Sequence, residues 1–310
     1  MNILWIKDNN IGHEKQAKIL LDELSKNREI NIQDINIRGF HPFFTYIDPV
    51  EENFYDLIIG AGHKTYSYIL DIKKSQKKSC KTVAILTPTF NKDKFDLICA
   101  PSHDQNKYTN SNNVIFFEGS LAKVSLNEPD DNVIVVAIGG KNKHYHFDED
   151  SILDQIKYFL SLYPKKKYYV FNSRRTPLSM NNKIAQLTET KELIFCDYRN
   201  NDISFESILH KSFAKLITRD SVNMIFESLS CRGSTYLVDM EVKNKVNKVV
   251  NTVNGLIEEK KIGYIEQSDM VDGLSTIKIH KQNIYHDVFA EVEKVAYKLN
   301  QLLWKLFTWY

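Results

Sequence analysis

The second half of the chain contains a stretch whose residue types suit the binding of an anion. Ser221 stands between a short apolar segment, 215–218, and a segment with helical spacing, so it would begin a helix. The backbone N–H groups in the first turn of such a helix have no partner within it, and they favour a phosphate. Glu227, further along the helix, would then reach a hydroxyl of a sugar joined to that phosphate. The same pattern also fits an ordinary helix, with Asp220 or Ser221 as its cap and Glu227 as a surface acid.

Two further loops carry residues that bind anions. Both follow apolar segments with the composition of a buried strand. They contribute Gly139, Gly140, Lys141, Lys143 and His144 after residues 133–138, and Ser173, Arg174, Arg175 and Thr176 after residues 168–171. Two consecutive arginines repel each other unless an anion or an acidic side chain joins them. Together with the helix start, these loops predict a phosphate site in the second half.

The first half offers acid–base chemistry instead. His13, His63 and His103 each follow a predicted strand, and Asp8 lies at the end of the first of these strands. Ligands of open α/β sheets bind beyond the carboxyl ends of the strands, and an imidazole titrates near neutral pH. We therefore expect an acid–base site that acts on a polyol, although each histidine would also suit an ordinary polar surface.

Short apolar segments that alternate with helical patterns indicate the fold that positions these residues. Segments of this kind form mostly parallel sheets covered by helices on both faces. The pattern restarts after the polar tract 124–132, which contains Pro129 and is typical of a linker. We predict an α/β fold with two domains of similar size, at residues 1–127 and 128–310.

The final segment, 284–310, is predicted to form one long helix, which we assign to the second domain. Its apolar residues repeat at alternating spacings of four and three and form a narrow seam. They are Val288, Val292, Val295, Leu299, Leu302 and Leu306. A helix of this kind either packs along a domain, including back against the first one, or lies on a membrane surface with its aromatic end.

Composition and missing motifs exclude several classes of protein. A net charge of +2 does not indicate a nucleic-acid partner, and the chain has no HExxH, P-loop, GxGxxG or GxSxG pattern. The four cysteines are scattered, and no apolar run approaches the roughly 18 to 20 residues that cross a bilayer. The acidic triplet 148–150 precedes a predicted helix and complements its dipole, so we expect no metal site. We expect a cytoplasmic protein that is attached at most to the inner face of a membrane.

Several short motifs occur in an order that resembles a known family. They are Asp8 with Gly12-His13-Glu14 and Gln16; Gly60-Ala61-Gly62-His63; Pro101 with His103-Asp104; Ile138-Gly139-Gly140 with Lys143-His144; Ser173-Arg174-Arg175-Thr176-Pro177; and Asp220-Ser221-Val222 with Met224 and Glu227. Over residues 1–240 the chain resembles the mitochondrial-fission "elongated mitochondria" family and its bacterial relatives.

The resemblance implies the GT-B architecture, in which two Rossmann-like domains face a cleft. An acceptor site lies in the first domain and a nucleotide-sugar site in the second. The implied activity is a metal-independent glycosyltransferase whose only small-molecule requirement is its nucleotide-sugar substrate, without a separate cofactor. The implied acceptor is a glycan or lipid of the cell envelope. A nucleotide-sugar epimerase on the same fold, and a non-catalytic module for recruitment at a membrane, are the alternatives.

The resemblance also assigns roles to residues. The general base would be His13, because GT-B transferases of the peptidoglycan type have a histidine after the first strand. His63, His103 and Asp8 would orient the acceptor, or one of them would act as the base in place of His13. The nucleotide sugar would contact Gly139, Gly140, Lys141, Lys143, His144, Ser173, Arg174, Arg175, Thr176, Asp220, Ser221, Met224 and Glu227. The first loop departs from the family, since Asn9 and Asn10 stand where glycine and lysine are expected. This departure weakens a phosphate or acceptor role for that loop.

Overall fold

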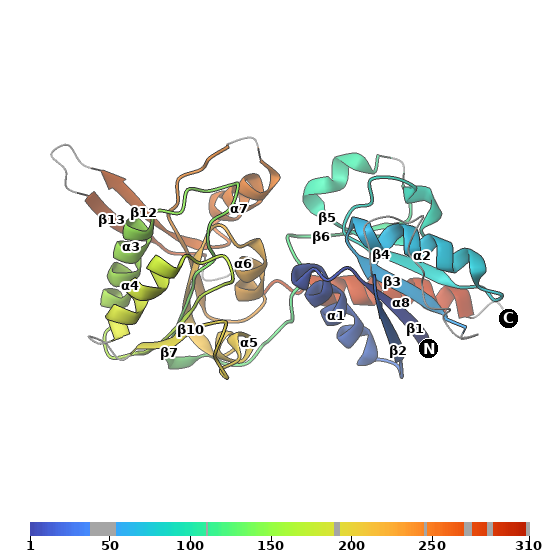
Figure 1. Cartoon of the computed structure of the whole chain (residues 1–310), viewed down its shortest axis with the longest axis horizontal. Helices are drawn as coiled ribbons and strands as arrows, with labels where there is room; N and C mark the ends of the chain where they lie inside the picture. The colour runs from blue at the N-terminus through green and yellow to red at the C-terminus, as the bar shows by residue number, and fades with distance from the viewer. Residues whose placement is uncertain are drawn as a thin grey trace. The chain divides into compact units, whose positions relative to one another are not determined.

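A computed structural model describes residues 1–37, 54–109, 111–188, 193–244, 247–269, 275–283 and 288–307. The chain divides into two compact units (Figure 1). Unit 1 comprises Met1–Lys123 and Ala290–Tyr310, and unit 2 comprises Val124–Phe289. This division differs from the predicted one in two ways: residues 124–127 lie in unit 2, and the terminal helix lies in unit 1. The backbone N–H of Ser125 donates to the Ser230 carbonyl at 3.0 Å, which attaches the linker to unit 2.

Unit 1 is built on a six-stranded parallel sheet in the order β2-β1-β3-β4-β5-β6. The strands are β1 (Asn2–Lys7), β2 (Asn31–Asn36), β3 (Leu57–Ala61), β4 (Lys81–Ile85), β5 (Leu97–Pro101) and β6 (Val114–Phe117). The helices are α1 (Ile11–Ser25), α2 (His63–Ser75) and α8 (Glu291–Phe307), with short 3-10 turns at Lys92–Lys94 and Ser102–Lys107. Helix α2 packs on the sheet through residues that include Tyr66 and Ile69, while α1 packs against β3 and α8.

Unit 2 contains a seven-stranded sheet in the order β13-β12-β11-β10-β7-β8-β9. The strands are β7 (Asp130–Ala137), β8 (Lys167–Phe171), β9 (Leu193–Cys196), β10 (Ser212–Thr218), β11 (Ser234–Val238), β12 (Gly263–Asp269) and β13 (Ser275–His280). All pairs are parallel except β12–β13. Helices α3 (Glu149–Leu162) and α4 (Leu178–Thr188) cover one face of this sheet, and α5 (Phe205–Leu209), α6 (Val222–Leu229) and α7 (Lys248–Glu258) cover the other (Figure 1). The predicted α/β class with two mostly parallel sheets is confirmed.

Each sheet has one point where the strand order reverses. In unit 1 the chain moves from β1 outward to β2, then returns to place β3 on the other side of β1. In unit 2 it moves from β7 through β8 to β9, then returns to place β10 beside β7. Loops diverge at the carboxyl ends of such strand pairs and leave room for a ligand. The loops after β1 and β3, and those after β7 and β10, are therefore where a site is expected.

The terminal helix begins at Glu291, because residues 288–290 are not helical. The predicted start at 284 is wrong to that extent, and residues 284–287 and the aromatic end at 308–310 lie outside the described part of the chain. Val292, Val295 and Leu299 are buried, and the Glu291 carboxylate accepts a hydrogen bond from the Glu118 backbone N–H at 2.6 Å. The helix is thus a packing element of unit 1. Over the described residues, no helix is long and apolar enough to cross a membrane.

Candidate functional site

The glycine turn after β7 is held tightly to the loop after β10. The backbone N–H of Gly139 donates to the Thr218 hydroxyl at 2.8 Å, and that of Gly140 donates to the Asp220 carboxylate at 2.8 Å. A Cβ atom at Gly139 would lie 2.2 Å from Asp220, and one at Gly140 would lie 2.1 Å from the Arg175 backbone. Both positions therefore need glycine for close packing. Because their N–H groups are already bonded, the two glycines shape the site but do not offer these donors to a phosphate.

Arg175 links the loop after β8 to the same turn. Its guanidinium Nη2 lies 2.9 Å from Asp220 Oδ2, and its backbone carbonyl accepts from the Lys141 N–H at 3.3 Å. The Asp220 side chain is fully buried, whereas that of Arg175 is 41% exposed. Burial raises the pKa of Asp220, and the hydrogen bonds from Gly140 and Arg175 oppose that rise. The acidic side chain that the arginine pair was expected to need is therefore Asp220, and it pairs with Arg175 and not with Arg174.

Arg174 is in a different position. Its side chain is exposed, and it forms no hydrogen bond or ion pair with any residue in the described ranges. The neighbouring Ser173 and Thr176 hydroxyls turn inward and donate to the Gly139 carbonyl, the former at 2.7 Å. Within the loop, Arg174 is thus the group that remains available to an anion.

Helix α6 begins at this point without a side-chain cap. Ser221 is its N-cap residue, but the Ser221 side chain makes no capping hydrogen bond. Most other described helices that begin with a polar N-cap residue do have a capping hydrogen bond from its side chain. Asn10 of α1 and Asp148 of α3 are examples. An uncapped first turn directs N–H groups and the positive end of the helix dipole outward.

Further along α6, Met224 packs against the apolar cluster on that face of the sheet, so its observed role is structural. Glu227 is half-buried on the same helix.

The loop that follows Gly140 combines exposed cations with an anchored asparagine. Lys141 and Lys143 are exposed, and His144 is half-buried. Burial, with Lys143 and Arg175 nearby, lowers the pKa of His144 below its ordinary value. Asn142, which was not among the predicted site residues, accepts from the backbone N–H groups of His144 and Tyr145 at 2.8 and 2.9 Å. Its side chain also donates to the Asp220 carbonyl at 3.1 Å. An asparagine in a polar loop after a strand is the signal for such a turn.

Buried polar atoms without partners gather at this site. Among the described residues, eight buried side-chain nitrogen or oxygen atoms have no hydrogen-bond partner. Four of the eight belong to His144, Tyr145, Arg219 and Asp220. The Arg219 guanidinium also pairs with Asp239 at 3.1 Å, and burial lowers its pKa. Buried polar groups are nearly always satisfied, so this concentration suggests that the site is completed by a polar ligand or by water.

In unit 1, Asp8 and His13 form a pair. The His13 Nδ1 atom lies 2.7 Å from Asp8 Oδ2, and their side chains are 25% and 3% exposed. Gly62, at the end of β3, packs onto the pair, since a Cβ there would lie 2.3 Å from His13 Nδ1. A carboxylate bonded to Nδ1 fixes the orientation of an imidazole and leaves Nε2 as its acid–base atom. The sequence placed both residues in the site but did not predict their contact.

The asparagines of the first loop have local roles. Asn9 adopts a left-handed conformation with φ of 60°, which asparagine tolerates well. The Asn10 side chain caps α1 by accepting from the N–H groups of Gly12 and His13 at 3.0 and 3.4 Å. The glycine and lysine expected here are therefore replaced by a turn and a helix cap that position His13.

The other two predicted histidines lie on the same edge of the sheet without joining the pair. His63 is exposed. It is the first residue of α2, which follows β3, the strand next to β1. His103 is exposed after β5, with β4 between it and β3. The acidic triplet 148–150 belongs to the start of α3, where Asp148 caps the helix and Lys183 pairs with Asp150.

Comparison with known proteins gives the fold a name. The chain is similar to UDP-GlcNAc 2-epimerase from Neisseria meningitidis bound to UDP-GlcNAc, with a TM-score of 0.55, 12% identity, and coverage of 98% of this chain and 100% of that one. It is similar to UDP-GlcNAc 2-epimerase from Methanocaldococcus jannaschii, with a TM-score of 0.52, 10% identity, and coverage of 97% and 100%. It is also similar to E. coli ADP-heptose LPS heptosyltransferase II, with a TM-score of 0.50, 9% identity, and coverage of 98% and 99%. The fold is thus GT-B-like, as predicted.

A family relationship is visible in the sequence itself. No curated protein matches the chain in sequence. The model of the family described as mitochondrial fission ELM1 matches residues 11–303, which is most of the chain. The chain therefore belongs to the mitochondrial fission ELM1 family.

Proposed function

We propose that this protein is a GT-B-type glycosyltransferase that binds a nucleoside diphosphate sugar at the carboxyl edge of the unit 2 sheet. The observation that carries the proposal is the state of two neighbouring groups. Arg175 is bonded to Asp220, which leaves Arg174 exposed and without a described partner near the uncapped start of α6. A free guanidinium and a helix N-terminus are both groups that bind phosphate.

The same groups suit the chemistry of glycosyl transfer. When the bond between sugar and diphosphate breaks, negative charge develops on the diphosphate oxygen. Arg174 and the first turn of α6 would stabilise that charge, and so promote departure of the leaving group. Glu227, half-buried on α6, would bind a ribose hydroxyl. No cofactor is needed for these steps.

The Asp8–His13 pair suits the other half of the reaction. An acceptor hydroxyl becomes a better nucleophile when a base removes its proton. His13 Nε2 is the proposed base, and Asp8 holds the ring through Nδ1. A cell-envelope glycan or lipid is the proposed acceptor class.

The first test is binding. The similar enzyme from Neisseria meningitidis is bound to UDP-GlcNAc, so UDP and UDP-GlcNAc are the first ligands to test, followed by ADP, GDP and their sugars. A ligand at 100 times its Kd stabilises a folded protein by about 2.7 kcal/mol, which a thermal-shift assay detects. If no nucleoside diphosphate or its sugar at millimolar concentration raises the melting temperature or gives heat in calorimetry, the proposal is wrong.

The second test identifies the reaction of the ligand that binds. Transfer of the sugar, or release of free nucleoside diphosphate with an acceptor extract, supports the transferase. An isomerised sugar still attached to its nucleotide would instead identify an epimerase. Binding without either product would identify a non-catalytic module.

A further inference from the structure

A lysine lies in the interior of unit 2. Lys215 is in the middle of β10, where alternate side chains point to opposite faces of the sheet. Ala214 and Leu216 belong to the cluster beneath α3 and α4, so Lys215 points to the opposite face, toward α6. Its side chain is completely buried. Burial of an ammonium group is costly unless several acceptors surround it.

The acceptors lie in the last turn of α6 and just beyond its end. The Lys215 Nζ donates to the carbonyl oxygens of Ser228 at 2.8 Å, Cys231 at 3.1 Å and Arg232 at 2.7 Å. These three bonds explain the lysine as an anchor for the end of the helix, since the last carbonyls of a helix lack partners within it. They do not require a sulfur atom at the same point.

The thiol of Cys231 nevertheless lies against the amine. Its Sγ atom is 3.2 Å from Lys215 Nζ, and the cysteine is 3% exposed. Burial lowers the pKa of Lys215. Burial raises the pKa of Cys231, but the nearby Lys215 opposes that rise. None of the other three cysteines has a contact between its sulfur and a lysine nitrogen in the described structure.

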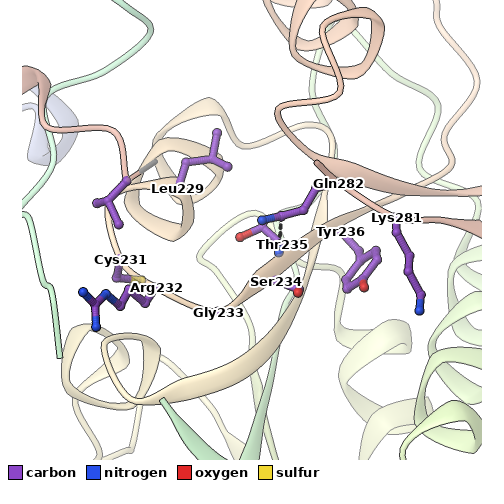
Figure 2. A pocket seen from close by; sticks show the side chains of 10 residues that line it. Leu229, Cys231, Arg232, Gly233, Ser234, Thr235, Tyr236, Lys281 and Gln282 are labelled. Carbon is purple, nitrogen blue, oxygen red and sulfur yellow. Dashed lines mark hydrogen bonds between the residues drawn. The ribbon is translucent and has the colours of Figure 1, made fainter. Parts of the chain in front are cut away.

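The protein has a pocket next to Cys231. Cys231 lines a pocket of about 290 Å³ at the amino end of β11, together with Leu229, Thr235 and Lys281 (Figure 2). The Thr235 backbone is fixed there by the Gln282 side chain, at 2.8 Å. Figure 2 shows the Cys231 sulfur between Leu229 and Arg232 on one side of the pocket. A space of this size admits a molecule as small as a peroxide.

We propose that Lys215 and Cys231 form an oxidative cross-link, with a hydroperoxide as the oxidant. In the first step the thiol attacks the peroxide, the O–O bond breaks, an S–O bond forms, and water leaves with the thiol proton. The product is a sulfenic acid. In the second step Lys215 Nζ first loses a proton to solvent and then attacks that sulfur. An N–S bond forms, the S–O bond breaks, and the leaving hydroxide takes a second proton from the nitrogen to form water. Sulfur is oxidised by two electrons and the peroxide is reduced by two.

The cross-link has a structural consequence for the turn between β10 and α6. It joins the middle of β10 to the chain just after α6, so it closes a loop that contains Thr218, Asp220 and Ser221. The closed loop restricts the unfolded chain and should raise the melting temperature of unit 2. The inference goes beyond the proposed function, because it holds whether or not a nucleotide binds.

The test uses the wild-type protein. Purified protein is treated with hydrogen peroxide, then digested without reductant and analysed by mass spectrometry. We expect a peptide pair joined through Lys215 and Cys231, lighter than the sum of the two peptides by two hydrogen atoms, and lost after treatment with a thiol reductant. Trypsin should also fail to cleave after Lys215 in the oxidised sample.

Matched variants isolate the pair. Cys196→Ser removes a buried thiol whose sulfur contacts the Ile194 carbonyl at 3.9 Å, and it should leave the cross-link intact. Cys231→Ser should abolish it. The inference is overturned if Cys231 of the wild-type protein stays a free thiol, or becomes a sulfinic acid while Lys215 remains unmodified. Because these outcomes are read in the wild type, a variant that fails to fold does not change the result.

Discussion

The guanidinium of Arg175 and the carboxylate of Asp220 are joined across a strand that belongs to neither residue. Arg175 follows β8, Asp220 follows β10, and β7 lies between these two strands. The ion pair therefore passes over the Gly139–Gly140 turn at the end of β7. A Cβ at Gly139 would collide with the Asp220 carboxylate of this pair, and one at Gly140 would collide with the Arg175 backbone. Two adjacent arginines thus do different work: Arg175 closes the turn, and Arg174 faces outward.

That difference predicts unequal effects of two alanine substitutions. Arg174→Ala should weaken nucleotide binding by about 1.5–3 kcal/mol, the range for a charge-assisted hydrogen bond, with the melting temperature unchanged. Arg175→Ala should lower stability by about 1–2 kcal/mol, because it leaves the buried Asp220 without its cation, discounted for the exposure of Arg175. Calorimetry and thermal unfolding measure the two quantities.

Arg232→Ala is the control for the arginine series. Arg232 precedes β11 at the opposite edge of the sheet and is similarly exposed. The Arg232→Ala substitution should leave nucleotide affinity at the wild-type value. Equal losses for Arg174→Ala and Arg232→Ala would show that the effect is one of net charge and would remove Arg174 from the site.

Two glycine-to-alanine substitutions should have opposite signs. At Gly140 the new methyl group meets the Arg175 backbone, which cannot move as a flexible side chain can, so we expect a loss of about 1–3 kcal/mol. At Gly255, in the interior of α7, nothing lies within 4 Å of the new Cβ, and the helix should gain about 0.5–1 kcal/mol. Chemical denaturation of both variants measures these changes. If Gly140→Ala left the free energy of unfolding unchanged, the turn would be looser than its contacts indicate.

His13→Ala should separate catalysis from donor binding. If His13 is the general base, turnover should fall about 100-fold or more with nucleotide affinity unchanged. Asp8→Asn should keep the ring near its place but weaken its orientation, and it should change the pH profile of turnover rather than the donor affinity. Steady-state kinetics with the donor found in the binding screen provides the measurement. Unchanged turnover in His13→Ala would transfer the role to His63, His103 or Asp8, or away from catalysis.

Stability should decline in mild acid partly through His144. The pKa of His144 in the folded protein is lowered from its ordinary value of 6.5 by burial and by Lys143 and Arg175. The unfolded chain therefore takes up the proton at higher pH than the folded chain does. The His144 contribution to stability is complete above pH 6.5 and is lost as the pH falls from there through the folded pKa.

The measurement is thermal unfolding followed by circular dichroism between about pH 7.5 and pH 5. His144→Gln should reduce the acid-dependent fall in melting temperature. His146→Gln changes an exposed histidine two residues away and is the matched control. If the two variants have the same pH dependence as the wild type, the His144 environment does not contribute to acid sensitivity.

The terminal helix can be tested through tryptophan fluorescence. Trp5 lies in β1 of unit 1, and the sequence of unit 2 contains no tryptophan. Leu299→Ala removes a side chain that is 1% exposed. The free energy of unfolding of unit 1, followed by tryptophan fluorescence, should fall by about 2–5 kcal/mol. Tyr297→Ala, at a position that is 65% exposed, should cause little change. An unshifted Leu299→Ala transition would mean that α8 does not stabilise unit 1.

The parts of the fold that follow from local pattern were predictable from the sequence. Short apolar runs such as residues 133–138 are typical of buried strands, and helical segments between them favour parallel pairing. Because the carboxyl ends of such strands share one edge, the strand pattern alone identifies the loops that carry His13, Arg175 and Asp220. The same reasoning did not find the β12–β13 pair, where polar residues alternate with apolar ones at the end of the sheet.

Contacts between loops were not predictable in the same way. The arginine pair required an anion or an acid, and only the three-dimensional packing shows that Asp220 supplies it to Arg175. The Asp8–His13 contact likewise depends on the close approach of Gly62 from another strand. The terminal helix shows the same limit: its apolar seam predicted burial, but a seam does not specify which domain receives it.

The return of the chain to unit 1 makes unit 2 an insertion within it. The chain leaves unit 1 after Lys123 and enters it again at Ala290, so α8 reaches α1 and β6 only after all of unit 2 has been synthesised. On the ribosome, the second unit in the sequence can therefore complete its fold before the first. Until α8 emerges, the surface of unit 1 that it covers stays open to water, and residues 1–123 become a finished domain only when α8 packs on them.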